Sequence, residues 1–201
     1  MQSVFDVRVN PKALLSPSAL NCYLDCPLKF YYKYVAGLAA PEEVSAEIDS
    51  AKFGSIFHYA AEHIYKELTA HGKVINKDTL EALLKEEVKL QNYVDNGFKE
   101  LFFHLPADER PEYNGVQLIN SAVILRYIQQ LLRNDLRHAP FTFVGSEQRV
   151  MEDVEIQTPK GAIRSRMGGI IDRMDSKDNV LRIVDYKTGG KADTPPSVES
   201  L

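Results

Sequence analysis

Hydrophobic residues recur at intervals of three and four along the first two thirds of the chain, the spacing that gathers them on one face of a helix. The pattern is clearest over residues 50–71, where it continues for several turns. Ser16 followed by Pro17 is typical of an N-cap and the first helical residue. After an extended lead-in over residues 1–15, the pattern predicts helices at 17–25, 27–35, 50–71, 78–102 and 113–137.

The last third of the chain changes to apolar runs separated by turn residues, which is the pattern of strands. The predicted strands are 141–157, with a break near residues 152–153, then 162–174 and 180–187. Thr158–Gly161 and Ser176–Asn179 are rich in turn-forming residues and separate these runs. The sequence therefore predicts an α+β fold in which N-terminal helices and a helical insertion pack on an antiparallel three-stranded β-meander.

Three charged residues lie within or directly after the last two strands, where charge is costly unless it is paired or binds something. A hairpin tip of two or four residues around Lys177 and Asp178 would give these opposite pairs: Ser176 with Asn179, Asp172 with Ile183, and Asp185 with Ile170. Asp172, Asp185 and Lys187 would then share one face of the sheet. The two carboxylates would be diagonal neighbours, about 7–8 Å apart at the backbone, and one hard divalent ion could bridge them.

Composition places the chain among ordinary globular proteins, with 44% hydrophobic and 26% charged residues in 201. No apolar run is long enough for a membrane span, and the N-terminus lacks the pattern of a signal peptide. Two cysteines four residues apart do not form a secreted disulfide framework, so a cytoplasmic location is expected. The net charge is −4, yet residues 160–191 hold eight Lys/Arg and four Asp, a local surplus that favours phosphate binding near the hairpin.

The motif Gly-x-Ile-Asp172-Arg, followed by Ile-Val-Asp185-Tyr-Lys187-Thr-Gly, resembles the PD-(D/E)XK nuclease superfamily, and most closely its RecB/AddB-like branch of recombination helicase–nucleases. Gly54-x-x-x-His58 in the third predicted helix resembles the helix motif of the same branch. The resemblance implies a restriction-endonuclease-like α/β core and a metal-dependent deoxyribonuclease, of exonuclease type, that acts on DNA in recombination and repair.

The resemblance also implies residue roles. Asp172, Asp185, His58 and the carbonyl of Tyr186 would hold one Mg²⁺ or Mn²⁺ ion, and Lys187 would orient or deprotonate the attacking water. The expected set is completed by Glu62 and Glu147 as accessory acids and by Arg166, Arg173 and Lys191 as substrate contacts. An alternative remains open: a catalytically inactive DNA-binding or structural module of a helicase–nuclease complex. In the structural case Asp172 would simply pair with Arg173 or Lys187.

The N-terminal segment Ser16-Pro-Ser-x-Leu-x-x-Tyr-x-x-Cys26-Pro-x-x-Phe30 is similar to the beginning of AddB-like nuclease modules. In some relatives the equivalent cysteine is the first of four ligands to an iron–sulfur cluster. No cysteine follows Cys26 in this chain, so an iron–sulfur cluster within it is not expected. A small buried residue at a helix junction is the favoured interpretation of Cys26.

Residues 1–201 are expected to form a single nuclease-like domain: N-terminal and His-bearing helices at 1–75, a helical insertion at 76–139 and the catalytic meander at 140–190. The family core continues with a further helix and strand, so the chain is interpreted as a fragment of a longer protein. The third strand would then expose an edge, which permits a domain-swapped or edge-paired dimer. A helicase domain or subunit is the other expected partner.

Overall fold

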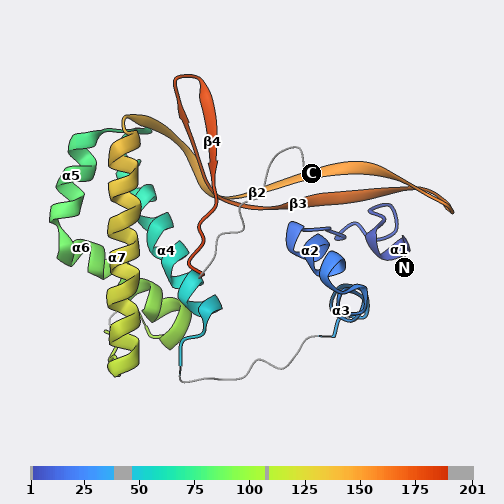
Figure 1. The fold of residues 1–201 in the computed structure, drawn as a ribbon, viewed down its shortest axis with the longest axis horizontal. Helices are drawn as coiled ribbons and strands as arrows, with labels where there is room; N and C mark the ends of the chain where they lie inside the picture. The colour runs from blue at the N-terminus through green and yellow to red at the C-terminus, as the bar shows by residue number, and fades with distance from the viewer. Residues whose placement is uncertain (1, 39–46, 107–108, 190–201) are drawn as a thin grey trace. The chain divides into compact units, whose positions relative to one another are not determined.

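The computed structural model describes residues 2–38, 47–106 and 109–189 (Figure 1). The chain folds as two compact units, and both contain segments that are distant in sequence. The N-terminal unit combines Met1–Val44 with Glu147–Ile171, and the helical unit combines Ser45–Ser146 with Asp172–Leu201, each as far as it is described. The predicted residues Gly190 and Lys191 lie outside the described residues.

The helical unit is built around α4 (Ser50–Leu68), which packs against α6 (Glu87–Phe98) and α7 (Gly115–His138) (Figure 1). Asp49 caps α4 by accepting a hydrogen bond from the Lys52 amide, and the apolar stripe predicted from the sequence forms the core, with Ile56, Ala60 and Ile64 almost fully buried. α5 (Lys77–Lys85) packs against α6 and α7, and η2 (Lys99–Phe103) extends α6. The predicted single helix over 78–102 is therefore wrong: it is interrupted at Glu86.

The N-terminal unit begins with a short helix, α1 (Gln2–Phe5), where an extended segment was predicted. α2 (Pro17–Asp25) matches its predicted bounds, and the predicted helix over 27–35 is divided into α3 (Pro27–Phe30) and η1 (Tyr31–Val35). Leu15 forms a parallel bridge with Met167, which connects this segment to the part of the sheet in the same unit. Next to that bridge the strands approach so closely that a Cβ atom on Gly168 would overlap the carbonyl oxygen of Val150.

The sheet contains four strands in the order β1-β2-β3-β4. β2 (Phe141–Thr158), β3 (Gly161–Lys177) and β4 (Val180–Val184) form the predicted antiparallel meander, and β1 (Val74–Ile75) adds a short strand that was not predicted. β2 is not broken at residues 152–153, whereas Glu147 within it has a positive φ of 48°. β4 ends at Val184, three residues before the predicted end.

The hairpin register differs from the predicted one by two residues. Asp178 and Asn179 form a two-residue tip with φ of 50° and 63°, the left-handed conformation of the tightest hairpin turns. Ser176 therefore pairs with Leu181, and Met174 rather than Asp172 lies opposite Ile183. Because both tips contain an even number of residues, the parity of the faces is kept. Continuing the observed register by one residue would bring Asp172 opposite Asp185, just after β4 has ended.

Candidate metal centre

His58 and Asp172 lie side by side in the helical unit. His58 projects from the middle of α4, and Asp172 stands on β3, directly before Arg173. Their closest polar atoms, Nδ1 of His58 and Oδ1 of Asp172, are 3.8 Å apart, and the two side chains are 29% and 13% exposed. Helix α4 and the hairpin thus bring together two groups that are 114 residues apart in the sequence, as the motif-based prediction requires.

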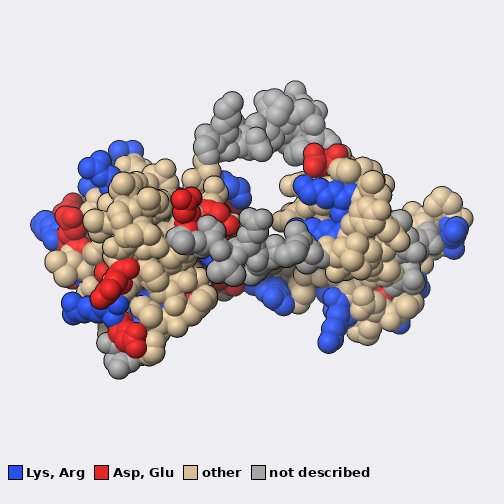
Figure 2. All heavy atoms as spheres, turned by 90° about the horizontal axis from the view of Figure 1, so that it is seen from below, with Lys and Arg blue, Asp and Glu red and all other residues tan. Residues whose placement is uncertain are grey.

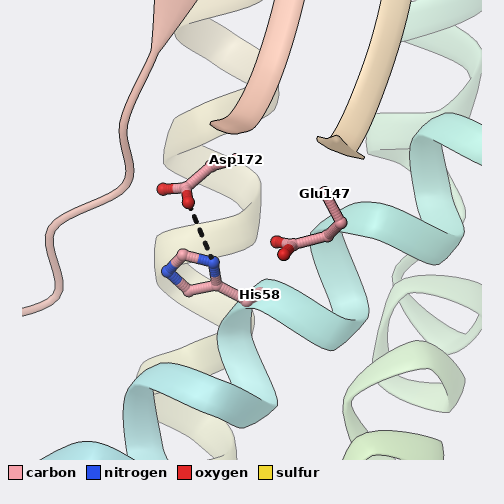
Figure 3. Close-up of side chains that lie close together, drawn as sticks. All are labelled: His58, Glu147 and Asp172. Atoms are coloured by element: carbon pink, nitrogen blue, oxygen red, sulfur yellow. Dashed lines mark ion pairs between the residues drawn. The ribbon is translucent and has the colours of Figure 1, made fainter. Parts of the chain in front are cut away.

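A third ligand group, the Glu147 carboxylate, completes this cluster (Figure 3). Glu147 follows directly after Ser146 on β2, and one possible ligand atom from each of His58, Glu147 and Asp172 lies within 4.8 Å of the others. A positive φ is unusual for a glutamate in a strand and costs about 1–3 kcal/mol. Such strain is typical of places where a bulge redirects a side chain toward a site.

Asp185 and Lys187 were predicted to belong to the same site as His58 and Asp172. In the structure they form an ion pair with each other. Nζ of Lys187 is 2.8 Å from Oδ2 of Asp185, and the two side chains are 65% and 61% exposed. The hydrogen bond from Lys187 to Asp185 raises the pKa of the Lys187 ammonium above its ordinary value. Asp185 is not among the three residues that converge, because it follows the last paired residue of β4 and no ladder holds it against β3.

Asp172 has one strong hydrogen-bond donor on the opposite side from His58. The backbone N–H of Tyr186 donates to Oδ2 of Asp172 at 2.5 Å, which leaves Oδ1 directed at the imidazole. A hydrogen bond of this kind fixes the orientation of a carboxylate, as the second shell does around metal ligands. Sequence reasoning proposed the carbonyl of Tyr186 as a ligand and missed the role of its amide.

Glu62 and His63, on the same helix as His58, have partners of their own. Glu62 forms an i,i+4 ion pair with Lys66 at 2.8 Å. Nδ1 of His63 lies 2.8 Å from the carbonyl oxygen of Tyr59, and its ring stacks on the Tyr59 ring. Neither of these contacts joins Glu62 to His58, so the accessory role expected for Glu62 stays a prediction.

The three residues predicted to contact substrate have different surroundings. Arg166, in the N-terminal unit, forms a two-pronged ion pair with Asp153, and Lys191 lies outside the described residues. Arg173 is only 1% exposed, so the prediction that it contacts substrate is wrong: its charge is used inside the protein. On the face shown in Figure 2, both Lys/Arg and Asp/Glu side chains reach the surface.

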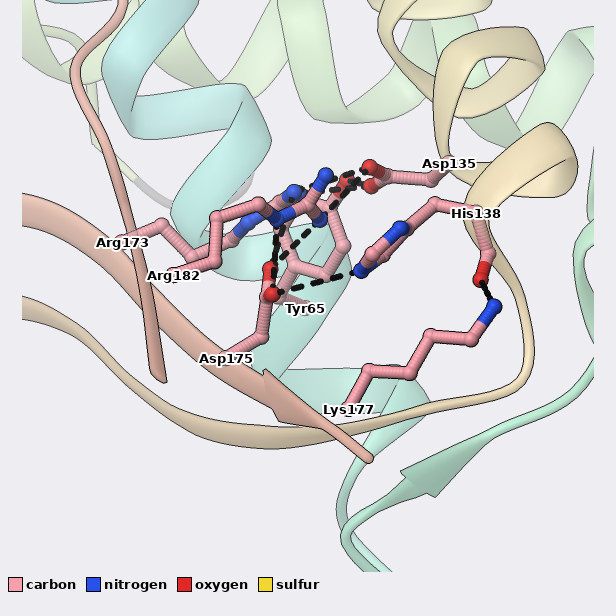
Figure 4. Close-up of polar contacts among 7 residues, drawn as sticks. All are labelled: Tyr65, Asp135, His138, Arg173, Asp175, Lys177 and Arg182. Atoms are coloured by element: carbon pink, nitrogen blue, oxygen red, sulfur yellow. Dashed lines mark hydrogen bonds and ion pairs between the residues drawn. The ribbon is translucent and has the colours of Figure 1, made fainter. Parts of the chain in front are cut away.

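Arg173 is the centre of a buried ion cluster that sequence reasoning did not anticipate (Figure 4). Its two terminal nitrogens donate to both carboxylate oxygens of Asp135 on α7, at 2.6 and 2.8 Å, and one of them lies 3.2 Å from Asp175. Arg182 of β4 donates twice to Asp175, at 2.7 and 2.8 Å. Two cations therefore balance two carboxylates, as burial of charge requires.

Helix α4 also takes part in the ion cluster, through Tyr65. The Tyr65 hydroxyl donates to Asp135, and burial raises the pKa of that hydroxyl well above its ordinary value, so it remains a donor. The Arg173 guanidinium lies over the Tyr65 ring, with Cζ 4.5 Å from the ring centroid. The cluster thus joins β3, β4, α7 and α4, and its central residue, Arg173, directly follows Asp172 in the sequence. The Asp-Arg-x-Asp pattern of residues 172–175 was the only sequence signal that pointed to it.

Replacing Glu147, whose backbone is strained, is expected to weaken metal binding without lowering the stability of the fold. Glu147→Gly removes a possible ligand but relieves the positive φ, so we expect Mn²⁺ affinity to fall at least about tenfold while the free energy of unfolding does not fall. Isothermal titration calorimetry and urea denaturation measure the two quantities. Glu152→Gly, at an exposed position of the same strand, is the control and should cost about 0.5–1 kcal/mol without weakening Mn²⁺ binding. Unchanged Mn²⁺ affinity in Glu147→Gly would remove Glu147 from the site.

The donor set of the cluster suits a divalent cation. Carboxylate oxygens are preferred by Mg²⁺ and Mn²⁺, and an imidazole nitrogen is accepted more readily by Mn²⁺ than by Mg²⁺. Cys22 and Cys26 are free thiols on the other unit. No helix among the described residues is both long and apolar enough to span a membrane.

Comparison with known proteins shows which family the chain belongs to. Three curated relatives carry the same name, which describes each as one subunit of an ATP-dependent helicase/deoxyribonuclease. The protein from Carboxydothermus hydrogenoformans is 28% identical over 89% of this chain, that from Leuconostoc mesenteroides 25% over 95%, and that from Clostridium perfringens strain SM101 24% over 90%. The chain spans only 16% of the length of each. Residues 14–200 match the PD-(D/E)XK nuclease superfamily, a family that generally uses divalent metals. The chain therefore belongs to the PD-(D/E)XK nuclease superfamily.

Proposed function

We propose that this chain is a DNA nuclease module that hydrolyses phosphodiester bonds with one divalent ion, Mg²⁺ or Mn²⁺, in recombination and repair. The observation that carries the proposal is the convergence of His58 and Asp172, with Glu147 beside them, next to the segment Asp185-Tyr-Lys187. The relatives are named as subunits of an ATP-dependent helicase/deoxyribonuclease, which supports DNA as the substrate and a helicase as the partner.

The proposed ligands are Asp172, His58, Asp185 and the carbonyl of Tyr186, with Glu147 as an additional acid. An ion bound there would neutralise charge on the scissile phosphate and lower the pKa of a bound water. Asp172 is prepared for this role, because the amide of Tyr186 fixes one of its oxygens and leaves the other beside His58. Asp185 is exposed and its partner is an exposed lysine, so it can exchange that ion pair for another cation at little cost.

Lys187 is proposed to act as a cation. The hydrogen bond to Asp185 raises the pKa of the Lys187 ammonium above its ordinary value, which favours the charged form. Its exposed ammonium is free to reach a phosphate oxygen and to stabilise the negative charge that grows there during hydrolysis. The role proposed for Lys187 is therefore to orient the phosphate and the attacking water and to stabilise charge.

The experiment that tests this function compares the chain with its Asp172→Asn variant, using end-labelled single- and double-stranded DNA with Mg²⁺, Mn²⁺ or EDTA. We expect metal-dependent cleavage that Asp172→Asn lowers at least about a hundredfold, because it removes a charged ligand. Asp178→Asn is the matched control: it makes the same change at the exposed hairpin tip, where asparagine also tolerates the positive φ, and should cleave like the original chain.

Two results would contradict the proposal. Cleavage that survives both EDTA and Asp172→Asn would mean that the reaction does not use this site. DNA binding without metal, combined with no cleavage by the chain, would favour the inactive DNA-binding module instead.

A further inference from the structure

The segment that carries Asp185 and Lys187 has no strand partner. β4 ends at Val184, and residues 185–188 belong to no helix or strand. The exposed Asp185 and Lys187 side chains contact each other rather than the body of the unit. The positions of these two groups therefore depend on how neighbouring residues of the segment are attached to the rest of the unit.

Tyr186 provides that attachment. Its ring packs edge-on against two consecutive residues of α4, with ring centroids 5.5 Å from both Phe57 and His58 and interplanar angles of 87° and 77°. The ring belongs to the border of the main hydrophobic core, and its hydroxyl is fully buried without a hydrogen-bond partner among the described residues. Because side chains alternate along an extended segment, burying Tyr186 directs both of its neighbours outward.

The same segment touches α4 one turn earlier. A Cβ atom on Gly54 would lie 3.3 Å from Oγ1 of Thr188, so the glycine allows Thr188 to approach the helix closely. The spacing Gly54-x-x-Phe57-His58 on the helix thus matches Tyr186-x-Thr188 on the segment. The two sequence motifs of this chain dock directly on each other.

We infer that Tyr186 is a positioning residue of the metal centre. Its ring holds the imidazole of His58 from one side, and its amide holds the carboxylate of Asp172 from the other, at 2.5 Å. Through the chain it also sets the points from which Asp185 and Lys187 extend. This inference rests on the proposed function for its consequence in catalysis, whereas the docking contact itself is measurable without metal or DNA.

The test uses three variants of the whole chain. Tyr186→Leu keeps an apolar side chain but removes the ring. Tyr186→Phe keeps the ring and removes only the unpaired hydroxyl. Tyr127→Leu is the matched control, because Tyr127 on α7 also packs edge-on against Phe57 but does not contact His58.

We expect Tyr186→Leu to remain folded by circular dichroism and to lose about tenfold to a hundredfold in kcat, with KM changed far less, because groups displaced by about 1 Å react much more slowly. Mn²⁺ affinity should fall by a similar factor, as it does when groups that orient metal ligands are removed. Tyr186→Phe should recover most of both quantities. Tyr127→Leu should leave both within about threefold, since it disturbs the same helix without reaching the site.

Nuclear magnetic resonance supplies a readout that is independent of activity. In the original chain and in Tyr186→Phe, the ring at position 186 should show Overhauser contacts with the His58 ring, and the amide of residue 186 should be protected from hydrogen exchange. Both signals should weaken in Tyr186→Leu. The original chain could show both signals, and lose them in Tyr186→Leu, and yet neither bind Mn²⁺ nor cleave DNA. That result would contradict the proposed function and leave the docking role of Tyr186 intact.

Three outcomes would overturn the inference, and the first two each concern a single chain. One is a folded Tyr186→Leu chain that cleaves DNA and binds Mn²⁺ as the original does. The other is the absence of contacts between the rings of Tyr186 and His58 in the original chain. Equal losses in Tyr186→Leu and Tyr127→Leu would also overturn it, because they would trace the effect to general packing on α4.

Discussion

Replacing Asp185 with asparagine is expected to lower the rate of DNA cleavage at least about a thousandfold, while Mn²⁺ affinity falls by no more than about tenfold. The reason is the separation seen in the structure: His58, Glu147 and Asp172 converge without Asp185, so three ligands remain for the ion. The proposed reaction nevertheless needs the second carboxylate at the phosphate, and stabilisation of charge in the transition state contributes several kcal/mol. Single-turnover cleavage and calorimetric titration measure the two effects.

Asp172→Asn is the informative comparison for Asp185→Asn. It should lose binding and cleavage together, because Asp172 lies at the centre of the cluster. The stability of Asp185→Asn should change by less than about 1 kcal/mol, since only an exposed ion pair is lost. Equal loss of Mn²⁺ affinity in the two variants would show that Asp185 contributes as much to ion binding as Asp172 does, and unchanged cleavage in Asp185→Asn would remove it from the reaction.

The second large effect is expected for stability. Asp135→Ala should lower the free energy of unfolding by about 3–5 kcal/mol, because it leaves the buried Arg173 without its main partner. Tyr65 would lose its acceptor at the same time. Urea denaturation followed by circular dichroism measures the change. Glu62→Ala, which removes one partner of an ion pair with the largely exposed Lys66, is the control and should cost less than about 1 kcal/mol.

A double replacement separates burial of charge from loss of packing. Arg173→Met combined with Asp135→Leu removes one cation and one carboxylate and leaves Arg182 with Asp175 as a balanced pair. Apolar residues of similar size often replace a buried ion pair without loss, so the double variant should recover most of the stability. A double variant as unstable as Asp135→Ala would mean that the geometry of these contacts, and not uncompensated charge, stabilises the unit.

The sequence was sufficient to predict the regular elements and the proximity of His58 to Asp172. Helical periodicity located α2, α4 and α7 within about three residues at each end, because each buries one continuous apolar stripe. The break at Glu86 and the short strand β1 were not predicted, since neither carries a proline, a glycine or a long apolar run. The motifs in α4 and the hairpin, not periodicity, brought His58 and Asp172 together.

The hairpin and the charged residues show where sequence reasoning ends. The two-residue and four-residue tips predicted around Lys177 and Asp178 give the same register. The left-handed backbone at Asp178 and Asn179 instead places a two-residue tip one position later, which shifts the register by two residues. Arg173 was expected to contact substrate, together with Arg166 and Lys191. Its partner in the structure is Asp135, which lies on α7 and precedes Arg173 by 38 residues in the sequence. A pair so distant in sequence leaves no local pattern from which it could be predicted.

The division of the chain into two interleaved units has a consequence for its synthesis. The guanidinium of Arg8 bonds to the carbonyl of Ala162, its partner 154 residues later, and Leu15 pairs with Met167. The first segment of the N-terminal unit therefore leaves the ribosome long before its strands exist, whereas helices α4 to α7 can pack as they emerge. Contacts this distant in sequence form slowly. Newly made chains should accordingly pass through a stage in which the helices are assembled and residues 2–38 still await their partners.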